Sequence, residues 1–436
     1  MARGFSNGKI KKAGILLEEL RSLQKFRAKY HVFPPNESRR LCEQMNELAE
    51  SIQEISHPQN EDELFLSEAK RRIRGEAAYL AHRLEGKTYD FDSVLEILGI
   101  PREDVDALKP WLRRNKNKTM GAVERLYSSK EIGSYELLPR MDIPSIRRQT
   151  EEVAAAHIQN YHKILGGFLE TLTKVGMYLR DIDAQPTTEE RSYFSHLENR
   201  LALSVLAFCF STEEGISKIR EKDLVRLYGH EGMGHSLNRI ITLSSSLPEF
   251  LKIDSDLTIS SEESLAQFYE RRLLEDLKQN PGVQEKLGIK HKFQEIYQEV
   301  KDAEQIEKYF DKLYHYAIVV LADKSFGDLD DKNGIKKRLD YLDELSLNKG
   351  YTRDFILKNR ENIDEEGNLN SGLVAELRYS TDPVLRARKE FSSNGMRYIG
   401  NERGIIDATL LTGFWTPKGL IQRARVIAEN YSRSES

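Results

Sequence analysis

The sequence has little cysteine and no long apolar run, and each shortage excludes a class of protein. Its 436 residues include two cysteines, Cys42 and Cys209, which are too few for a disulfide framework. No apolar stretch approaches the roughly 20 residues of a membrane-spanning helix. The first residues also lack the apolar core of a secretory signal. We therefore expect a cytoplasmic protein with no membrane partner.

The chain also lacks an excess of charge of one sign. It carries 66 Lys and Arg against 70 Asp and Glu, a net charge of −4, so no nucleic-acid partner is expected. The basic cluster at residues 70–74 is interpreted as a solvated helix face. Only 12 prolines and 27 glycines interrupt the chain, which favours a mainly helical protein with short connections.

Apolar residues at helical spacing predict several long helices. They cover residues 9–31, 37–56 and 61–84, then 145–182, 212–244, 261–279 and 284–324. The fourth of these is either one long helix or a broken pair, with Gly166 and Gly167 as the break. A soft boundary near residue 120 divides an N-terminal helical region, 1–120, from a larger domain, 121–436.

The clearest strand signal lies just before the fifth of these predicted helices. Residues 192–205 mix aromatic and aliphatic side chains, which fits one strand or a hairpin, or alternatively the start of a helix. Residues 183–188 before them are expected to form a loop. A strand here could line a cleft and pair with an extended peptide.

The strongest chemical signal is the segment L-Y-G-H-E-G-M-G-H-S-L at residues 227–237. His230 and His235 have the chemistry of zinc ligands, and Glu231 stands where a general base would stand. Five residues at about 100° each place the second imidazole about 140° round a regular helix from the first. Both can bind one metal only if the helix is widened, as in a π-helical turn. Gly232 and Gly234 would permit that distortion.

A third ligand is expected on the following helix, where Glu263 is the candidate. The alternative is a capping box, with Ser260 as the N-cap and Glu263 three residues later. Glu270, seven residues further on, lies on nearly the same face. It could orient a ligating histidine or be a solvated surface carboxylate.

These motifs resemble those of a known family. H-E-x-x-x-H at 230–235, followed by E-S-L-A at 263–266, is similar to the microtubule-associated tyrosine carboxypeptidase-like metallopeptidases, which have an EGLA-type second helix. Residues 351–354, Y-T-R-D, echo an aromatic-Thr-Lys-Asp stretch of that family. The order also resembles dipeptidyl peptidase III, with HExxGH, and helical peptidases with HExxPGH and EGWA. The likeness covers mainly residues 190–280.

The resemblance implies a multi-helix, zincin-like metallopeptidase with a small edge sheet beside the cleft. It implies Zn²⁺ held by His230, His235 and Glu263, and hydrolysis of peptide bonds by a zinc-bound water with Glu231 as base. The expected reaction removes one C-terminal residue from a peptide or protein tail. Candidates for oxyanion stabilisation or substrate binding are Tyr314, His315, Tyr398 and Arg397, although ordinary helix packing accounts for these residues equally well.

Two other classes of function stay open at this point. A zinc hydrolase of a non-peptide amide would share all the zinc residues and differ only in its cleft. A non-catalytic helical interaction protein would carry a degenerate site. The retention of Glu231 beside both histidines argues against degeneracy, because a relic site has no physical need for its base.

Overall fold

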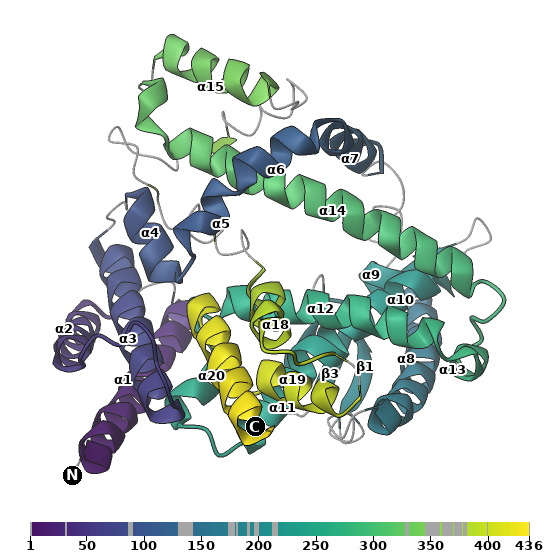
Figure 1. Ribbon diagram of the computed structural model, residues 1–436. Helices are drawn as coiled ribbons and strands as arrows, with labels where there is room; N and C mark the ends of the chain where they lie inside the picture. The colour runs from purple at the N-terminus through teal and green to yellow at the C-terminus, as the bar shows by residue number, and fades with distance from the viewer. Residues whose placement is uncertain are drawn as a thin grey trace.

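Helices make up most of the described chain, which confirms the mainly helical prediction (Figure 1). The computed structural model describes residues 2–30, 33–85, 90–129, 143–172, 179, 182–189, 192–195, 200–211, 217–327, 331–344, 358–359, 369, 377, 382–398 and 400–435. The Y-T-R-D echo at 351–354 lies outside these residues. No helix within the described ranges has both the length and the apolar character needed to cross a membrane.

The N-terminal helices share a hydrophobic core with the C-terminal half of the chain. They are α1 (Ala2–Tyr30), α2 (Pro35–Ser51) and α3 (Glu61–Glu85), and α3 lies beside the last helix, α20 (Pro417–Glu435). Arg72 of α3 is fully buried and donates hydrogen bonds to the carbonyls of Phe250 and, at 2.6 Å, Ile253. These contacts join the two regions of sequence.

A second core lies under the long helix α14 (Phe293–Ala322), which crosses the upper part of Figure 1. The helices that surround it are α4 (Phe91–Leu98), α5 (Arg102–Asp106), α6 (Leu108–Arg114), α7 (Lys116–Ser129) and α15 (Lys332–Glu344). Because α7 runs through residue 120, the chain has no loop at the proposed boundary. The division into 1–120 and 121–436 stays a prediction.

Helix α8 (Pro144–Leu172) runs through Gly166 and Gly167 without interruption, so the long-helix alternative is right at this point and the break is wrong. Two glycines cost a helix roughly 1 kcal/mol each relative to alanine. The flanking side chains of Leu165, Phe168 and Leu169 are buried in the main core, and that burial offsets the cost.

Residues 192–205 contain strands, as the hairpin alternative predicted. Strands β2 (Tyr193–Ser195) and β3 (Arg200–Ser204) pair antiparallel. The loop predicted at 183–188 is instead β1 (Asp183–Thr187), which pairs with β3 in parallel and gives the sheet order β1-β3-β2. The short polar sequence of β1 gave no strand signal, because an edge strand needs few buried side chains and tolerates a proline.

The remaining elements follow this sheet along the chain. A short helix, α9 (Val205–Phe208), leads into a second antiparallel pair, β4 (Cys209–Ser211) and β5 (Ser217–Ile219). The helical elements that follow are α10 (Glu221–Leu227), η3 (Tyr228–Ser236), α11 (Leu237–Ser244), η4 (Glu249–Lys252), α12 (Ile259–Lys278), α13 (Pro281–Lys286), η5 (Lys324–Phe326), α18 (Pro383–Ser393) and α19 (Asn401–Leu411).

Candidate metal centre

The histidine segment is a π-helix, η3, as the five-residue spacing predicts. The wider turn brings His230 and His235 onto one face, with their ring centroids 5.0 Å apart. The hydroxyl of Ser236 donates a 2.7 Å hydrogen bond to the Glu231 carbonyl, five residues earlier. Tyr228 opens the element from a fully buried position, and its hydroxyl lies 2.8 Å from Nδ1 of His162 on α8.

The glycines of η3 allow a close approach to the next helix. A Cβ placed on Gly234 would stand 2.3 Å from the Cα of Ala266, and one on Gly229 would stand 2.7 Å from the Cα of Glu270. Gly232 faces only ordinary contacts at 3.4 Å. Gly234 was predicted only to permit the helix distortion, but the structure shows that close packing on α12 also requires a glycine there. Gly229 has the same packing requirement.

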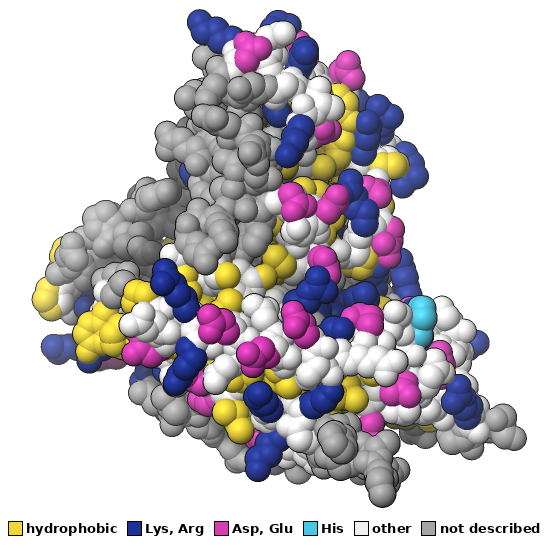
Figure 2. Space-filling view, turned by 90° about the vertical axis from the view of Figure 1, so that its left-hand side faces the viewer, with side chains coloured by type: hydrophobic (Ala, Val, Ile, Leu, Met, Phe, Trp, Pro, Cys, Tyr) yellow, Lys and Arg dark blue, Asp and Glu magenta, His cyan; other side chains and the backbone are white. Residues whose placement is uncertain are grey.

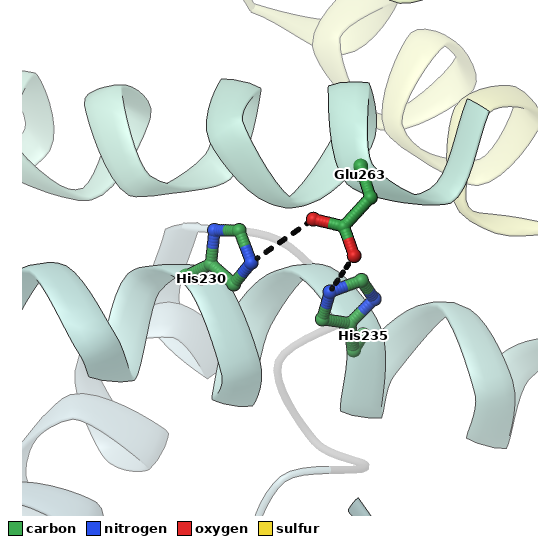
Figure 3. A group of neighbouring side chains, drawn as sticks. All are labelled: His230, His235 and Glu263. Atoms are coloured by element: carbon green, nitrogen blue, oxygen red, sulfur yellow. Dashed lines mark ion pairs between the residues drawn. The ribbon is translucent and has the colours of Figure 1, made fainter. Parts of the chain in front are cut away.

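Glu263 of α12 points at both histidines (Figure 3). Its Oε2 lies 3.4 Å from Nε2 of His230, and its Oε1 lies 3.6 Å from Nε2 of His235. One ligand atom from each residue falls within 4.8 Å of the others. The three predicted metal ligands are thus brought together from two elements.

The capping-box alternative for Glu263 is wrong. Helix α12 has Thr258 as its N-cap, and no capping hydrogen bond of the Ser260 side chain exists in the described structure. Glu262 is the carboxylate that turns back, accepting a 2.7 Å hydrogen bond from the Thr258 hydroxyl. The Glu263 side chain, one residue later, points instead toward η3.

Glu270 supports the other ring nitrogen of His230. Its Oε2 lies 3.6 Å from Nδ1, and its Oε1 accepts a 2.5 Å hydrogen bond from Arg226. Arg226 also pairs with Glu307 on α14 at 3.0 Å. Of the two alternatives for Glu270, the structure supports the one in which it orients a histidine. A carboxylate on the second nitrogen fixes the tautomer that leaves Nε2 free to bind a metal.

The two imidazoles have opposite protonation tendencies. Burial lowers the pKa of His230, but the nearby carboxylates of Glu263 and Glu270 outweigh this effect and raise the pKa to about 10. Burial lowers the pKa of His235 to about 4. Burial has the opposite effect on a carboxyl and raises the pKa of Glu231 to about 7, although the positive charge of His230 lowers it. The metal-free cluster therefore holds a proton on His230, which a divalent cation would displace.

These residues open into a cavity of about 510 Å³. His230, Glu231, His235 and Glu263 lie along one wall, and residues from β2, α11 and the loop before α20 form the others. These include Tyr193, Phe194, Arg239 and Phe414. The predicted small sheet is therefore beside the cluster, and β2 is one of its two edge strands.

The four further candidates lie elsewhere. Tyr314 stacks against Phe310, and His315 is buried within α14, where burial lowers its pKa to about 3. The Tyr398 hydroxyl donates to Asp407, and Arg397 is exposed. None of the four is among the described residues that line the cavity beside His230. Their role as substrate residues stays a prediction, and their positions match ordinary packing.

Sequence reasoning missed Arg226, Arg239 and Phe414. Arg226 and Arg239 precede and follow the two histidines by four residues, so helical spacing was a usable signal for both. Phe414 comes from a loop far along the chain, and no local pattern could have found it.

Comparison with known proteins adds no relative on which to base a function. No family model, curated protein or solved structure matches the chain.

Proposed function

We propose that the protein is a zinc-dependent metallopeptidase. The observation that carries the proposal is the convergence of His230, His235 and Glu263 at the wall of a cavity, with Glu231 beside them. Two imidazoles and one carboxylate are the donor set of many catalytic zinc sites, which keep one position for water or substrate.

The spacing of the donor atoms suits a zinc ion. Ligand atoms at 2.0–2.1 Å from a tetrahedral ion lie about 3.3 Å from one another. Oε2 of Glu263 stands 3.4 Å from Nε2 of His230, and its other oxygen, Oε1, stands 3.6 Å from Nε2 of His235, so each oxygen approaches one imidazole at about this spacing. A structural ion pair alone would need only one histidine near this carboxylate, whereas two imidazoles converge on it.

A bound zinc ion supplies a Lewis acid, which lowers the pKa of a water and polarises a carbonyl. Glu231 then has the task of receiving the water's proton and passing it to the leaving amine. Burial raises its pKa in the metal-free protein, which strengthens the carboxylate as a proton acceptor. Glu270 holds His230 in the tautomer that the metal requires.

The cavity favours a peptide over a small amide. Ser192, Tyr193 and Phe194 line it from the outer strand β2 and the residue before it, and the pairing described for that strand is to β3 alone. An extended peptide could add to such an edge through its backbone. Arg239 is the one Lys or Arg among the described residues that line the cavity. It pairs with Asp254 at 2.7 Å, and the α-carboxylate of a carboxypeptidase substrate would have to share its guanidinium.

The test compares matched peptides that end in a free carboxylate or in an amide. Mass spectrometry of the products with zinc-loaded protein should show loss of one C-terminal residue from the free acids alone. Internal cleavage of both peptides would support an endopeptidase. Hydrolysis of small amides with no peptide cleavage would support the non-peptide hydrolase, and no turnover of either kind would contradict the proposal.

A further inference from the structure

A larger cavity, of about 1030 Å³, lies apart from the histidines between helices of the N-terminal and C-terminal parts. Its walls come from α3, α4, α5, α18 and α20 together with residues 54–57. It shares no lining residue with the cavity at His230 among the residues that the structure describes. Its volume is at the upper end of the roughly 300–1,000 Å³ of small-molecule pockets.

The lining of this cavity is basic, although the chain as a whole is slightly acidic. Eight Lys or Arg side chains line it against four Glu, whereas the whole chain has a net charge of −4. The cations come from four separate helices, so they surround the space. Figure 2 shows the left-hand side of Figure 1, where basic and acidic side chains intermix over the surface. The excess among the lining residues is therefore not general to this face, although Arg102 and Arg386 are each paired with Asp side chains just outside the lining.

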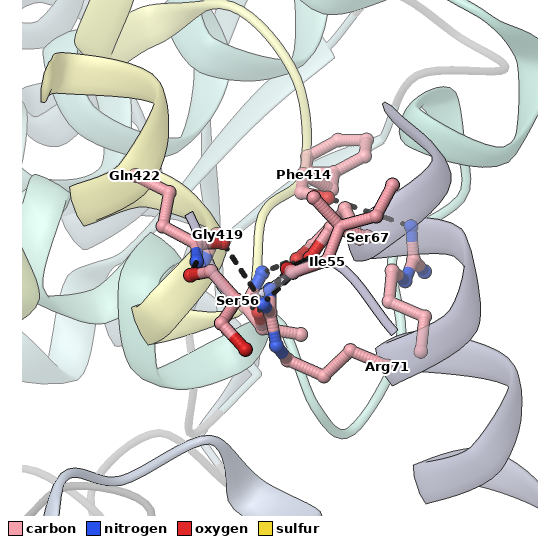
Figure 4. A network of polar contacts seen from close by, with 10 residues as sticks. Ile55, Ser56, Ser67, Arg71, Phe414, Gly419 and Gln422 are labelled. Atoms are coloured by element: carbon pink, nitrogen blue, oxygen red, sulfur yellow. Dashed lines mark hydrogen bonds and ion pairs between the residues drawn. The ribbon is translucent and has the colours of Figure 1, made fainter. Parts of the chain in front are cut away.

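One arginine is held rigidly in the cavity wall (Figure 4). Arg71 pairs with Glu68, and its Nη2 donates to Gln422 at 2.9 Å and to Ser67 at 3.3 Å. Gln422 in turn donates to the Ser56 carbonyl at 3.1 Å. This network ties α3 to α20 and fixes the polar floor of the cavity before any ligand binds.

Other cations are available to a ligand. Arg74 pairs with Glu96 at 3.0 Å and Lys70 with Glu54 at 2.7 Å, but both carboxylates are well exposed. Surface ion pairs of this kind contribute little and are readily exchanged. Lys389 of α18 and Lys418 of α20 form no ion pair with any residue that the structure describes. These two lysines provide the uncompensated positive charge.

The lining also restricts the type of anion. Its apolar members are aliphatic, such as Leu95, Ile97 and Ile421, and no Phe, Tyr or Trp occurs among the described lining residues. The one aromatic ring among the described lining residues belongs to His57, which is exposed. A nucleotide base would therefore find little to stack against, although stacking is a common source of base affinity. Cations on several helices fit a molecule that carries several anionic groups.

We propose that the basic cavity binds a small polyphosphate that lacks an aromatic base, such as a polyol with several phosphate groups. Lys389 and Lys418 would contact its phosphates together with Lys70 and Arg74 of α3. The inference is independent of the proposed peptidase activity.

The test is calorimetric titration of the full-length protein with inositol hexakisphosphate at about 0.15 M ionic strength. We expect one saturable site. Lys389→Glu with Lys418→Glu should weaken binding by about tenfold or more. The matched control reverses two exposed lysines elsewhere, Lys286 and Lys308, and should change the affinity by less than about twofold. Equal loss in both double variants would show nonspecific attraction and overturn the proposal.

Two further variants locate the bound polyphosphate. Glu54→Gln with Glu96→Gln removes the competing carboxylates and should tighten binding. His235→Ala should bind with unchanged affinity, and a loss there would place the ligand at the histidine cluster instead. Tighter binding of ATP, or of a polyglutamate peptide, than of inositol hexakisphosphate would contradict the assigned ligand class.

Discussion

Nδ1 of His230 and Oε2 of Glu270 lie 3.6 Å apart, on the side of the imidazole that faces away from Glu263. Glu270 is itself held by Arg226, which bridges to Glu307. The orientation of one proposed ligand thus depends on a chain of charges that ends on α14. This arrangement gives the first prediction.

Glu270→Gln should weaken zinc affinity by about 10- to 100-fold, because the amide no longer holds the His230 ring as a carboxylate does. A competition titration against a chelator measures the change. Glu307→Gln is the matched control, since it alters the exposed end of the same chain of charges and should have a much smaller effect. Unchanged zinc affinity in Glu270→Gln would refute the positioning role.

Adjacent glutamates on α12 give a matched pair for the metal site. Glu263→Ala should abolish stoichiometric zinc, as should His230→Ala and His235→Ala, each from about one ion per chain. Glu262→Ala should keep the zinc, because its carboxylate bonds to Thr258 and not to the histidines. Elemental analysis after gentle purification measures the zinc content of each variant. Full zinc content in Glu263→Ala would exclude it as a ligand.

Glu231→Gln should retain zinc and lose hydrolysis. The amide keeps the size of the side chain but cannot accept a proton, and general-base catalysis contributes about 10²–10⁴-fold. Turnover of a peptide that the parent cleaves should therefore fall by about 100-fold or more. Parental turnover in a zinc-loaded Glu231→Gln variant would show that another group is the base.

Two alanine substitutions in η3 test the close packing. Gly234→Ala places a methyl group 2.3 Å from the Cα of Ala266, so the elements must separate. Such overpacking typically costs about 1–3 kcal/mol of unfolding free energy. Gly232→Ala meets its nearest neighbours at 3.4 Å and should be tolerated. Chemical denaturation compares them, and equal stability of the two variants would contradict the packing argument.

The buried carboxyl of Glu76 should make stability fall as pH rises. Burial raises its pKa to about 7 from an ordinary value of 4.5, so the folded state keeps a proton that the unfolded state releases between those values. Stability is then full below about pH 4.5 and declines up to about pH 7, by at most about 3 kcal/mol. Glu76→Gln should reduce this slope in denaturation curves measured across that range. An unchanged slope would show that Glu76 does not cause it.

The cluster of two histidines and a glutamate was predictable from the sequence because its information is local. The five-residue spacing of His230 and His235 predicts a π-helical turn on the hypothesis that both face one ion, and η3 has that geometry. Glu263 followed from a second short motif. The choice between ligand and cap needed the structure, because it depends on the direction in which one side chain points across to η3.

What could not be predicted depends on contacts between distant segments. Gly166 and Gly167 remain helical because of the core that surrounds Leu165 and Phe168. Strand β1 exists because β3 offers it hydrogen bonds. Phe414 reaches the cavity from the far end of the chain. The sequence within a few residues of each position carries no information about these distant neighbours.

The contact between Gly234 and Ala266 also bears on how tightly a metal could be held. Because the backbones of η3 and α12 touch at this point, α12 cannot slide along η3 without placing a larger side chain there. The distance from Glu263 to the histidines is therefore set when the core forms. A site whose ligands are ordered by folding loses less conformational entropy when an ion binds, so part of the affinity for metal originates in a contact that includes no ligand atom.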